Sequence, residues 1–568
     1  MMVEIKKRIE HVLKEVGVTS VIELSLPPTS DMGDFAFSCF LLAKDQKKNP
    51  ADVARDMESK IKNQKSKIID DVKAFGPYVN FFINGAELAK IVLDYVDEQF
   101  GTSDLGKGKT ILVEYGCPNP MKAFHLGHLK NLITGEAVCR VLENVGYDVI
   151  RMNYQGDVGM HIGKSLWGIV DWFPEFEAMR SAALTVRVEF LGKAYAHGAT
   201  HFEAGPEEAK EVTEYTNAVY RGTDEKIMSV YREARQWSLD YFETIYAKLG
   251  VKFDEYYFES ETVDRGVALV KEFQAKDIYR ESEGAVIFPG SAYDLHDRVF
   301  LNSQGFPTYE AKELALSEMR WTRHQDAERL IHVVGKEQSE YFRVLFAAMK
   351  VMGVPGGEKE SHLAGGFLQL KGDQKMSSRK GNVITGDALL SLVETRVGEI
   401  MGGRDVLEKE VVVRRVSVAA LNYAMLRSGV SDDIAFDLEQ SIAVEGDSGP
   451  YLLYIVARIN SILKKSKIIS HKSKINVPTE IVSEEKQLLL ALAEFPEAAK
   501  QAAETLDPSY VAHYLFGLAQ AFNTFYQRCQ VLQVDETLQA FRLDVVRAVA
   551  QTMTRGLYLL GIETVEEM

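Results

Sequence analysis

Long uncharged apolar runs are missing from this sequence of 568 residues, and cysteine is scarce. No segment reaches the roughly 18 uncharged apolar residues that a membrane-spanning helix needs, so a membrane protein is not expected. The four cysteines, Cys39, Cys117, Cys139 and Cys529, lie far apart and form no C-x-x-C pair. This spacing disfavours a zinc site and a disulfide framework, so we predict no protein-bound structural metal and a reducing, cytoplasmic location.

Acidic residues outnumber basic residues in this sequence. It has 82 Asp and Glu and 66 Lys and Arg, which gives a net charge of −16. An acidic surface repels phosphate, so non-specific binding of nucleic acid along the whole surface is disfavoured, although a local basic groove is not. Internal repeats and low-complexity tracts are absent as well. Hydrophobic residues make up 46% of the chain and charged residues 26%. These are ordinary values for a globular protein, and the length predicts about three or four domains.

Composition divides the chain into blocks. Residues 1–105 mix helical and strand-like stretches, and the Gly-rich GTSDLGKGK (101–109) at their boundary with the next block is typical of a linker. Residues 106–386 contain apolar, β-branched strands, interrupted by a charged helical insertion at about residues 163–275. A helical connecting segment (387–430) and a helical block (431–568) follow, with apolar residues at three- and four-residue spacing. We therefore predict an α/β protein: a Rossmann-type doubly wound parallel sheet, with an α+β N-terminal domain and an all-α C-terminal helix bundle.

A strand, a loop, a helix and a second strand follow one another at the start of the second block. TILVEY (110–115) has the apolar, β-branched character of a buried parallel strand, and GCPNPMKAF after it contains the Gly and Pro residues of a loop. Apolar residues then recur at helical spacing after His128, Gly146 is a suitable stop, and YDVIRMNY is strand-like. Ligands of such a βαβ unit bind beyond the carboxyl ends of its strands. This predicts that His125 and His128 in FHLGHLK lie where the helix begins, at the ligand end of the sheet.

Three roles for the two histidines are compatible with this position. A metal site is disfavoured, because the pair lacks the i, i+4 spacing and the glutamate of H-E-x-x-H, and no third ligand is evident nearby. A structural role, with one ring capping the helix and the other packed in the core, is the default for an isolated pair. Alternatively, imidazoles beside the free N–H groups of a helix N-terminus can donate hydrogen bonds to phosphate, with Gly127 leaving room for a nucleotide. A second, independent element is needed to decide.

A polar segment much later in the chain supplies that element. After the strand-like GFLQL, the segment KGDQKMSSRKGNV is dense in Lys, Arg, Ser and Gly. Lys375, Arg379 and Lys380 on such a loop could close over a triphosphate and neutralise charge in the transition state. Taken alone, the segment is more typical of a solvated basic hairpin.

HLGH on a βαβ unit, followed by KMSSR, resembles in that order the two signature motifs of class I aminoacyl-tRNA synthetases. Within that class, the chain resembles the arginyl-tRNA synthetase family over nearly its full length. DMGDFAF and VNFFIN are similar to the family's N-terminal domain, and CPNPMKAFHLGH with NYQGDVGMHIGK is similar to its active site. DPSYVAHYLFGLAQAFNTFYQRCQVL and LLGIETVEEM are similar to its anticodon-binding domain.

The resemblance implies ATP-dependent ligation of L-arginine to tRNA(Arg) through an arginyl-adenylate, with Mg2+ on the phosphates of ATP. It assigns ATP binding to His125, Gly127, His128, Lys375, Met376, Ser377 and Ser378, and catalysis to His125, His128, Lys122, Lys375, Arg379 and Lys380. Ser378 stands where the second lysine of K-M-S-K-S is usual. Members of the family that lack this lysine often carry a basic residue upstream of the first motif, and Lys122 fits that pattern. Lys122 could instead be an exposed loop lysine.

The same resemblance implies an arginine pocket at Glu114, Cys117, Asn119, Tyr309, Glu313 and Gln338. A guanidinium has five donors in one plane, so paired carboxylates are its natural partners, and a site built for it leaves acceptors unpaired when an ammonium binds. Tyr309 and Glu313 are four residues apart and share one helical face. Cys117 is more often serine in the family, and Glu313 more often aspartate. Glu313 could instead be a carboxylate on the surface of a helix.

The resemblance also implies the partners of the outer domains. We expect residues 1–105 to contact tRNA and residues 431–568 to bind its anticodon. Phe522, Phe525 and Tyr526 could stack on bases, although aromatic residues at helical spacing are more often core residues. The family further implies a monomer, and activation of arginine only when tRNA is bound. Two alternatives stay open: a class I synthetase for another amino acid, and a synthetase-like tRNA-binding protein without aminoacylation.

Overall fold

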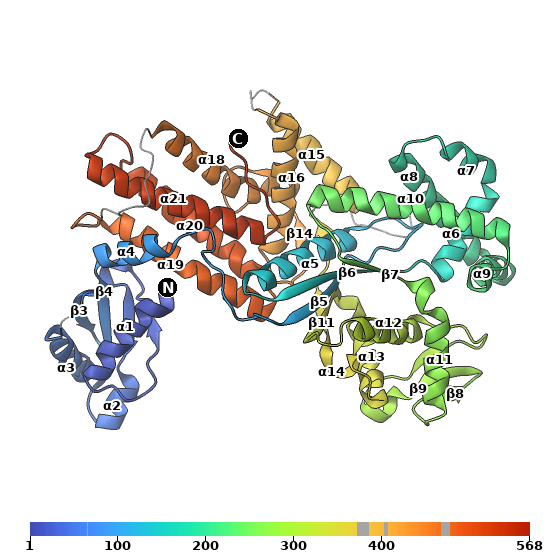
Figure 1. The fold of residues 1–568 in the computed structure, drawn as a ribbon, viewed down its shortest axis with the longest axis horizontal. Helices are drawn as coiled ribbons and strands as arrows, with labels where there is room; N and C mark the ends of the chain where they lie inside the picture. Colours follow the sequence, from blue (N-terminus) through green and yellow to red (C-terminus); the bar gives the residue numbers. More distant parts are fainter. Residues whose placement is uncertain (65, 372–384, 403–406, 467–476) are drawn as a thin grey trace.

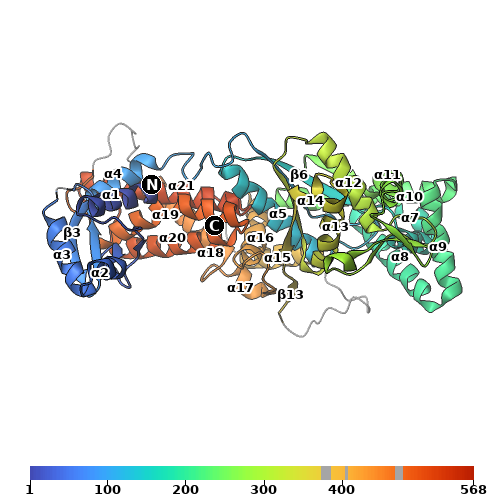
Figure 2. The same ribbon diagram turned by 90° about the horizontal axis from the view of Figure 1, so that it is seen from below.

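The computed structural model describes residues 1–64, 66–371, 385–402, 407–466 and 477–568. The molecule is an elongated row of domains (Figure 1 and Figure 2). The N-terminal domain lies at one end, the C-terminal helices lie beside it, the parallel sheet is in the middle, and a helical insertion forms the far end. Among the described residues, helices with the length and hydrophobicity of a membrane span are absent.

The N-terminal domain combines an antiparallel sheet with helices, as predicted. Its strands are β1 (Leu24–Ser25), β2 (Phe35–Ser38), β3 (Ile69–Phe75) and β4 (Tyr78–Ile83), in the order β1-β2-β4-β3. Its helices are α1 (Met2–Glu15), the 3₁₀ helix η1 (Ser30–Met32), α2 (Phe40–Gln46), α3 (Pro50–Lys62) and α4 (Gly85–Tyr95). The side chains of Asn49 and Asn84 cap α3 and α4. Helices α1 and α4 contact α19 (Ser483–Thr505), so this domain packs against the C-terminal helices.

The central sheet has parallel strands in the order β12-β11-β5-β6-β7. These strands are β5 (Thr110–Tyr115), β6 (Asp148–Gln155), β7 (Glu255–Phe258), β11 (Arg329–Gly335) and β12 (Glu360–Gly365). The chain first builds outward from β5 to β7, and then adds β11 and β12 on the other side of β5. The switch point of a doubly wound sheet therefore lies between β5 and β11, which confirms the predicted Rossmann-type fold.

Different helices cover the two faces of the sheet. Ile111 and Val113 of β5 share a core with residues of α5 (Leu126–Asn144), which connects β5 to β6 as predicted. Leu112, between them, belongs to a separate core with Trp321 of α12 (Tyr309–Arg323). Because side chains alternate along a strand, Glu114 lies on the same face as Leu112, toward α12.

Further elements surround α12. They are the helices α11 (Val263–Gln274), α13 (Ser339–Met352) and α14 (Gly356–Lys359), and the 3₁₀ helices η2 (Glu259–Thr262), η3 (Gly290–Tyr293) and η4 (Lys336–Gln338). A small antiparallel sheet of β8 (Arg280–Ser282), β9 (Ala285–Phe288) and β10 (Arg298–Leu301) lies on the same side (Figure 1).

The insertion between β6 and β7 consists of α6 (Met160–Asp171), α7 (Phe173–Met179), α8 (Leu184–Ala204), α9 (Pro206–Arg221) and α10 (Glu225–Leu249). Glycine lets α6 and α8 approach closely, since a Cβ on Gly168 would lie 2.1 Å from the carbonyl oxygen of Ala194. The range predicted to be a helical insertion, 163–275, also contains β7, which is an edge strand of the central sheet. This strand has four residues between two helices, so the helical pattern of the surrounding residues dominates the prediction for the range.

The described residues of the rest of the chain are mostly helical, as predicted, apart from β13 (Leu368–Leu370) and β14 (Ile434–Phe436), which pair in parallel. The helices are α15 (Gly386–Ile400), α16 (Lys409–Leu426), α17 (Leu438–Ile442), α18 (Gly449–Lys465), α19 (Ser483–Thr505), α20 (Ser509–Arg528) and α21 (Glu536–Leu559). Phe522 and Phe525 are fully buried core residues, whereas Tyr526 is 39% exposed. Asn144 at the end of α5 accepts hydrogen bonds from Arg555 of α21, so the bundle is joined to the helix that carries the two histidines.

Candidate active site

The loop between β5 and α5 carries the first motif across the carboxyl edge of the sheet. Cys117 and Met121 have positive φ angles of 41° and 60°, a conformation that is costly for residues other than glycine and is common at functional sites. The backbone N–H of Met121 donates to the Ser238 hydroxyl of α10 at 2.8 Å, and its carbonyl accepts from the Ser165 hydroxyl of α6 at 2.9 Å. The insertion therefore fixes the loop that leads to the histidines.

His125 is the N-cap of α5 and forms a reciprocal pair with His128. The backbone N–H of each residue donates to the Nδ1 atom of the other at 3.3 Å. The two rings stack with their centroids 3.5 Å apart. The pair therefore has a structural role, because it caps the helix, but that role uses only the Nδ1 atoms.

The hydrogen bonds of the two histidines also fix their tautomers. Each Nδ1 accepts, so a neutral ring must carry its proton on Nε2. Desolvation and the positive charge of Lys122 lower the pKa of His125 to about 4. Burial, with the charges of His125 and Lys122, also lowers the pKa of His128. Near pH 7 each ring is therefore neutral and offers one Nε2–H, which has no hydrogen-bond partner in the described part of the chain. Two such donors at a helix N-terminus suit an anionic ligand.

Gly127 makes room for the histidines themselves. A Cβ at this position would lie 3.1 Å from Nδ1 and Cε1 of the His125 ring. The missing side chain therefore lets this ring fold back over the start of α5. This role within the protein is separate from the nucleotide contact that the sequence predicts for Gly127.

The second motif lies outside the described residues, and with it lie Lys375, Met376, Ser377, Ser378, Arg379 and Lys380. The chain shortly after the motif is described. Thr385 forms an isolated β-bridge with His125, and the N–H of Gly386 donates to the carbonyl of Phe124 at 2.7 Å. The segment that follows the second motif thus contacts the first motif directly.

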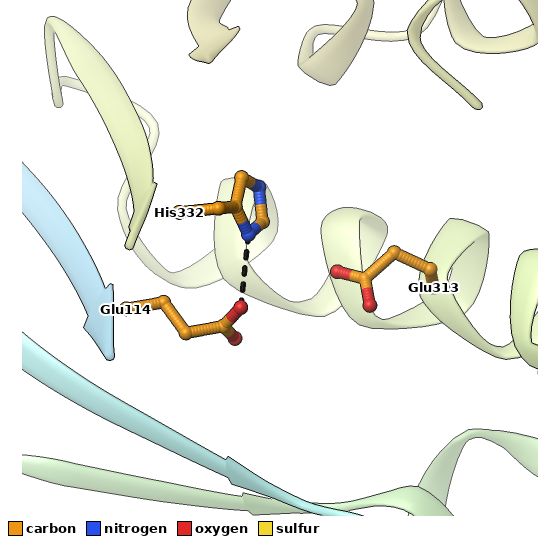
Figure 3. A group of neighbouring side chains, drawn as sticks. All are labelled: Glu114, Glu313 and His332. Atoms are coloured by element: carbon orange, nitrogen blue, oxygen red, sulfur yellow. Dashed lines mark hydrogen bonds and ion pairs between the residues drawn. The ribbon is translucent and has the colours of Figure 1, made fainter. Parts of the chain in front are cut away.

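Two carboxylates meet beside the switch point of the sheet (Figure 3). Glu114 comes from β5 and Glu313 from α12, and only 3% and 4% of their surfaces are exposed. The buried guanidinium of Arg320 bridges them. Its Nη1 donates to Oε1 of Glu313 at 2.9 Å, and its Nη2 forms an ion pair with Oε2 of Glu114. Glu313 is therefore not a surface carboxylate.

His332 extends this group of charges. It lies opposite Glu114 in the register of β11 and β5, and its Nδ1 is 2.9 Å from Oε1 of Glu114. Its Nε2 is 2.8 Å from Oε2 of Glu360, which also accepts hydrogen bonds through Oε1 from Ser317 and Trp321 of α12. Ionised carboxylates only accept hydrogen bonds, so both ring nitrogens of His332 must donate and the ring carries a positive charge.

Burial sets the ionisation of this cluster. It raises the pKa of Glu313 to about 8, and the charges of Glu360 and Glu259 add to an effect that the charge of His332 only partly offsets. Burial also opposes the ionisation of Glu360, but the hydrogen bond and charge of His332 outweigh it and lower the pKa of Glu360 to about 2. Burial lowers the pKa of Arg320 to about 10, so the guanidinium stays charged at neutral pH. Glu313 is therefore protonated far more readily than Glu360.

Glu114, Glu313 and His332 also have the donor types of a metal site, and their ligand atoms lie within 4.8 Å of one another (Figure 3). Arg320 contacts both carboxylates, so the protein itself supplies the positive charge that a cation would bring. Ion pairs within the protein thus account for this donor set, and we assign no metal to it.

Cys117 and Asn119, both predicted for the arginine pocket, lie in the loop that follows β5. Burial raises the pKa of the Cys117 thiol to about 12, and the charge of Glu313 contributes to the rise. A Cβ on Gly156 would lie 2.3 Å from Oδ1 of Asn119, so this glycine, which follows β6, leaves space for the amide. The loop therefore brings a neutral thiol and an amide to the carboxyl edge of the sheet.

Tyr309 and Gln338, the other predicted pocket residues, are more open. Tyr309 begins α12, one turn before Glu313, and is 54% exposed. Gln338 lies in η4, directly after β11, and is also exposed. Neither side chain has a hydrogen-bond partner among the residues that the structure describes. Both can therefore offer polar groups to a ligand at this edge.

Lys122 is partly buried in the loop before the histidines. Its Nζ lies 5.5 Å from the centre of the Tyr195 ring of α8. Burial lowers the pKa of Lys122, and the charge of Lys164 adds to the effect. Lys122 is therefore not a fully exposed loop lysine.

Three members of the charged cluster, Arg320, His332 and Glu360, are not among the residues that the sequence predicts. His332 gives a weak signal, because it is a polar residue inside the apolar strand LIHVVG. Arg320 lies seven residues after Glu313 and so on the same face of α12, but many amphipathic helices carry such pairs. No pattern in the sequence connects Glu360 with His332.

Comparison with known families covers almost the whole chain. The family described as "tRNA synthetases class I (R), catalytic domain" matches residues 90–438. The "Arginyl tRNA synthetase N terminal domain" matches residues 3–83, and the "DALR anticodon binding domain" matches residues 452–568.

Individual proteins that are similar to the chain are named arginine–tRNA ligase or arginyl-tRNA synthetase. The chain is 32% identical to the arginine–tRNA ligase of Clostridium perfringens, with 98% of each chain covered. It is also 32% identical to that of Treponema denticola, with 96% of this chain and 95% of the other covered. The arginyl-tRNA synthetase structure from Thermus thermophilus has a TM-score of 0.77 at 25% identity, with 99% of each chain covered. The structure from Plasmodium falciparum, 18% identical, has the same fold, with a TM-score of 0.74 over 100% of this chain and 98% of the other.

Proposed function

This chain belongs to the arginyl-tRNA synthetase family, and from that premise we propose that it joins L-arginine to tRNA(Arg), using ATP, through an arginyl-adenylate. One observation carries the proposal. The Nε2–H donors of His125 and His128 stand at the start of α5, at the edge of the sheet where Glu114 and Glu313 form a buried carboxylate pair. The first feature suits a phosphate and the second suits a guanidinium.

In the first step, a carboxylate oxygen of arginine attacks the α-phosphorus of ATP, the bond to the β-phosphate oxygen breaks, and pyrophosphate leaves. The hydrogen bonds from His125 and His128 strengthen as charge accumulates on the five-coordinate phosphate. Lys122 adds positive charge beside them, and Mg2+ bound to the phosphates would neutralise more. From the second motif we propose ATP contacts by Lys375, Met376, Ser377 and Ser378 and charge neutralisation by Lys375, Arg379 and Lys380.

Arginine is selected by its guanidinium. We assign the ion pairs with that group to Glu114 and Glu313, with Tyr309 and Gln338 toward the open side of the pocket and Cys117 and Asn119 toward the loop. Where the family usually has aspartate, Glu313 is one methylene longer, and Arg320 holds its carboxylate within the cluster. Lysine would be rejected because a single ammonium cannot satisfy acceptors placed for a planar fork.

In the second step, a hydroxyl of the terminal ribose of tRNA attacks the arginyl carbonyl carbon, and AMP leaves as its bond to that carbon breaks. We assign contact with tRNA to residues 1–105, catalysis to residues 106–386 with the insertion between β6 and β7, a connecting role to residues 387–430 and anticodon binding to residues 431–568. Matches to an N-terminal arginyl-tRNA synthetase domain and to an anticodon-binding domain support the two outer assignments.

ATP–pyrophosphate exchange tests the proposal with each of the twenty amino acids, in the presence and absence of tRNA. We expect exchange with arginine alone, and only when tRNA is present. Exchange driven by a different amino acid would identify another class I synthetase. Retained tRNA binding without any exchange would identify a tRNA-binding protein that does not catalyse.

We also propose that the protein acts as a monomer in the cytoplasm. Its four cysteines are unpaired, and three of them, Cys39, Cys139 and Cys529, are buried, which suits a reducing compartment. Sedimentation of the purified protein should give a single species of 63.7 kDa. A species of twice that mass would contradict the monomer.

A further inference from the structure

His332 is a buried histidine of β11 whose two ring nitrogens both contact carboxylates. Its Nδ1 lies 2.9 Å from Oε1 of Glu114, and its Nε2 lies 2.8 Å from Oε2 of Glu360. All three side chains are buried, so solvent weakens these contacts little. If the ring turned, it would lose at least one of two charge-assisted hydrogen bonds. His332 therefore fixes the carboxylate of Glu114 relative to that of Glu360.

Glu360 connects His332 to α12. Its Oε1 accepts hydrogen bonds from the hydroxyl of Ser317 at 2.5 Å and from Nε1 of Trp321 at 2.8 Å. Ser317 lies one turn after Glu313 on the same face of α12. A continuous, buried chain of hydrogen bonds therefore runs from β5, through the imidazole and Glu360, to the helix that carries Glu313.

Glu114 and Glu313, the two carboxylates assigned to the guanidinium of arginine, lie on different elements, β5 and α12 (Figure 3). Oε2 of Glu114 forms an ion pair with Arg320 but accepts no hydrogen bond within the described part of the chain. Oε2 of Glu313 also has no hydrogen-bond partner among the described residues. Each carboxylate thus keeps one oxygen for a ligand, and the distance between these oxygens depends on how α12 is held against β5.

We propose that His332 is a positioning residue of the amino-acid pocket. The hydrogen bonds that run through it from β5 to α12 set the separation of Glu114 and Glu313, and this separation determines which guanidinium both carboxylates can reach. The donors of a guanidinium have a fixed planar arrangement, so a change in the separation would weaken at least one of the two ion pairs. This inference rests on the proposed function, and it concerns a residue that does not itself touch arginine.

His332→Gln tests the positioning role, because glutamine is neutral and its one amide nitrogen cannot replace two ring nitrogens that donate in different directions. We expect the KM for arginine in tRNA-dependent exchange to rise about 10-fold or more, with kcat and the KM for ATP changed by less than about 3-fold. The preference for arginine over homoarginine, whose guanidinium is one methylene farther from the α-carbon, should fall about 3-fold or more.

These two readouts separate positioning from a loss of folded protein. A smaller amount of folded enzyme would lower the apparent kcat but would leave the KM for arginine and the preference over homoarginine unchanged. A KM for arginine within about 2-fold of the wild type, or an unchanged preference, would overturn the inference.

His362→Gln is the matched control. His362 lies opposite His332 in the register of β11 and β12, and both rings contact Phe342. Its Nε2 donates to the carbonyl of Val334 at 3.2 Å, and no carboxylate contacts its ring among the described residues. This variant should keep the KM for arginine, the KM for ATP and the preference of the wild type. An equal rise in the KM for arginine in this control would overturn the inference, because the contact with carboxylates would then not matter.

Ser317→Ala provides a milder change at the other end of the chain of hydrogen bonds, because it removes only the hydroxyl that donates to Glu360. We expect the KM for arginine to rise about 3-fold with kcat unchanged. If His332→Gln does not fold, this variant decides: a raised KM for arginine supports the inference, and an unchanged KM overturns it.

The wild-type protein separates this inference from the function on which it rests. If the wild type gives no exchange with arginine, the proposed function fails and the inference fails with it. If the wild type gives exchange and His332→Gln matches it, only the inference about His332 fails.

Discussion

Arginine should bind more tightly as the pH rises from 7 to 9. The carboxyl of Glu313 has its pKa raised to about 8 by burial, so it is mostly protonated at pH 7. A protonated carboxyl has lost the charge that pairs with a guanidinium, and arginine keeps its own side-chain charge over this whole range. A proton must therefore leave Glu313 when arginine binds, and binding improves as the pH passes through about 8.

The size of the effect follows from this pKa. The ionised fraction of Glu313 is about one in eleven at pH 7 and about ten in eleven at pH 9. If arginine binds only the ionised form, its apparent affinity rises about 10-fold between these two values.

Other titratable groups near Glu313 follow a different course. Burial lowers the pKa of Arg320 only to about 10, and the pKa of Glu360 is lowered to about 2. Burial raises the pKa of the Cys117 thiol to about 12 and those of the Tyr154 and Tyr341 hydroxyls well above their ordinary value. The remaining charged neighbours are held in buried ion pairs, which involve Glu114, His332, Glu259 and Lys312.

The assay is the KM for arginine in tRNA-dependent pyrophosphate exchange at pH 7, 8 and 9, with ATP and tRNA saturating. Glu318→Gln is the matched control, because Glu318 lies on α12 but its side chain is 40% exposed and pairs with Arg265. This variant should keep the pH profile, whereas Glu313→Gln should flatten it and bind arginine weakly. A KM that does not change with pH in the wild type, or that rises with pH, would contradict an ion pair between ionised Glu313 and arginine.

Three further substitutions test other parts of the account. His128→Asn removes one Nε2–H donor and should slow adenylate formation, measured by exchange, about 10²- to 10³-fold, and a change within a few-fold would reject the donor role. Lys122→Met should lower exchange and raise the KM for ATP, because Lys122 compensates for the lysine that the second motif lacks; unaltered exchange would reject this compensation. Lys130→Met should lower the calorimetric unfolding temperature, because the buried Lys130 ammonium donates to the carbonyls of Gly366 and Asp432 at 2.8 and 3.0 Å, and the Gly366 carbonyl is buried. A buried carbonyl left without a partner costs about 1–3 kcal/mol, so an unchanged unfolding temperature would contradict this role.

The βαβ unit around the histidines could be predicted because local rules decide it. The apolar, β-branched residues at 110–115 require burial on both faces, and the helical spacing after His128 ends at Gly146. These two features place His125 and His128 at the helix start, where the structure has them. Their tautomers could not be predicted, since these depend on the Nδ1 hydrogen bonds that form only in the folded chain.

The contacts among the buried charged residues could not be predicted from the sequence, for a different reason. Glu114 and His332 are 218 residues apart and meet only because β5 and β11 are neighbours in the sheet. The residue type of Arg320 does not show whether its side chain is solvated or buried between two carboxylates. Only the tertiary packing shows this. The edge strand β7 could not be predicted for a related reason. It has four residues and is stabilised as a strand by its pairing with β6.

Transfer of labelled arginine to purified tRNA(Arg) measures the ligation of arginine to tRNA(Arg) itself. We expect acid-precipitable label that requires the protein, ATP and an intact terminal ribose, with none on tRNA whose terminal ribose has been oxidised. Absence of label from arginine under these conditions, or labelling of tRNA with a different amino acid, would contradict the ligation of arginine.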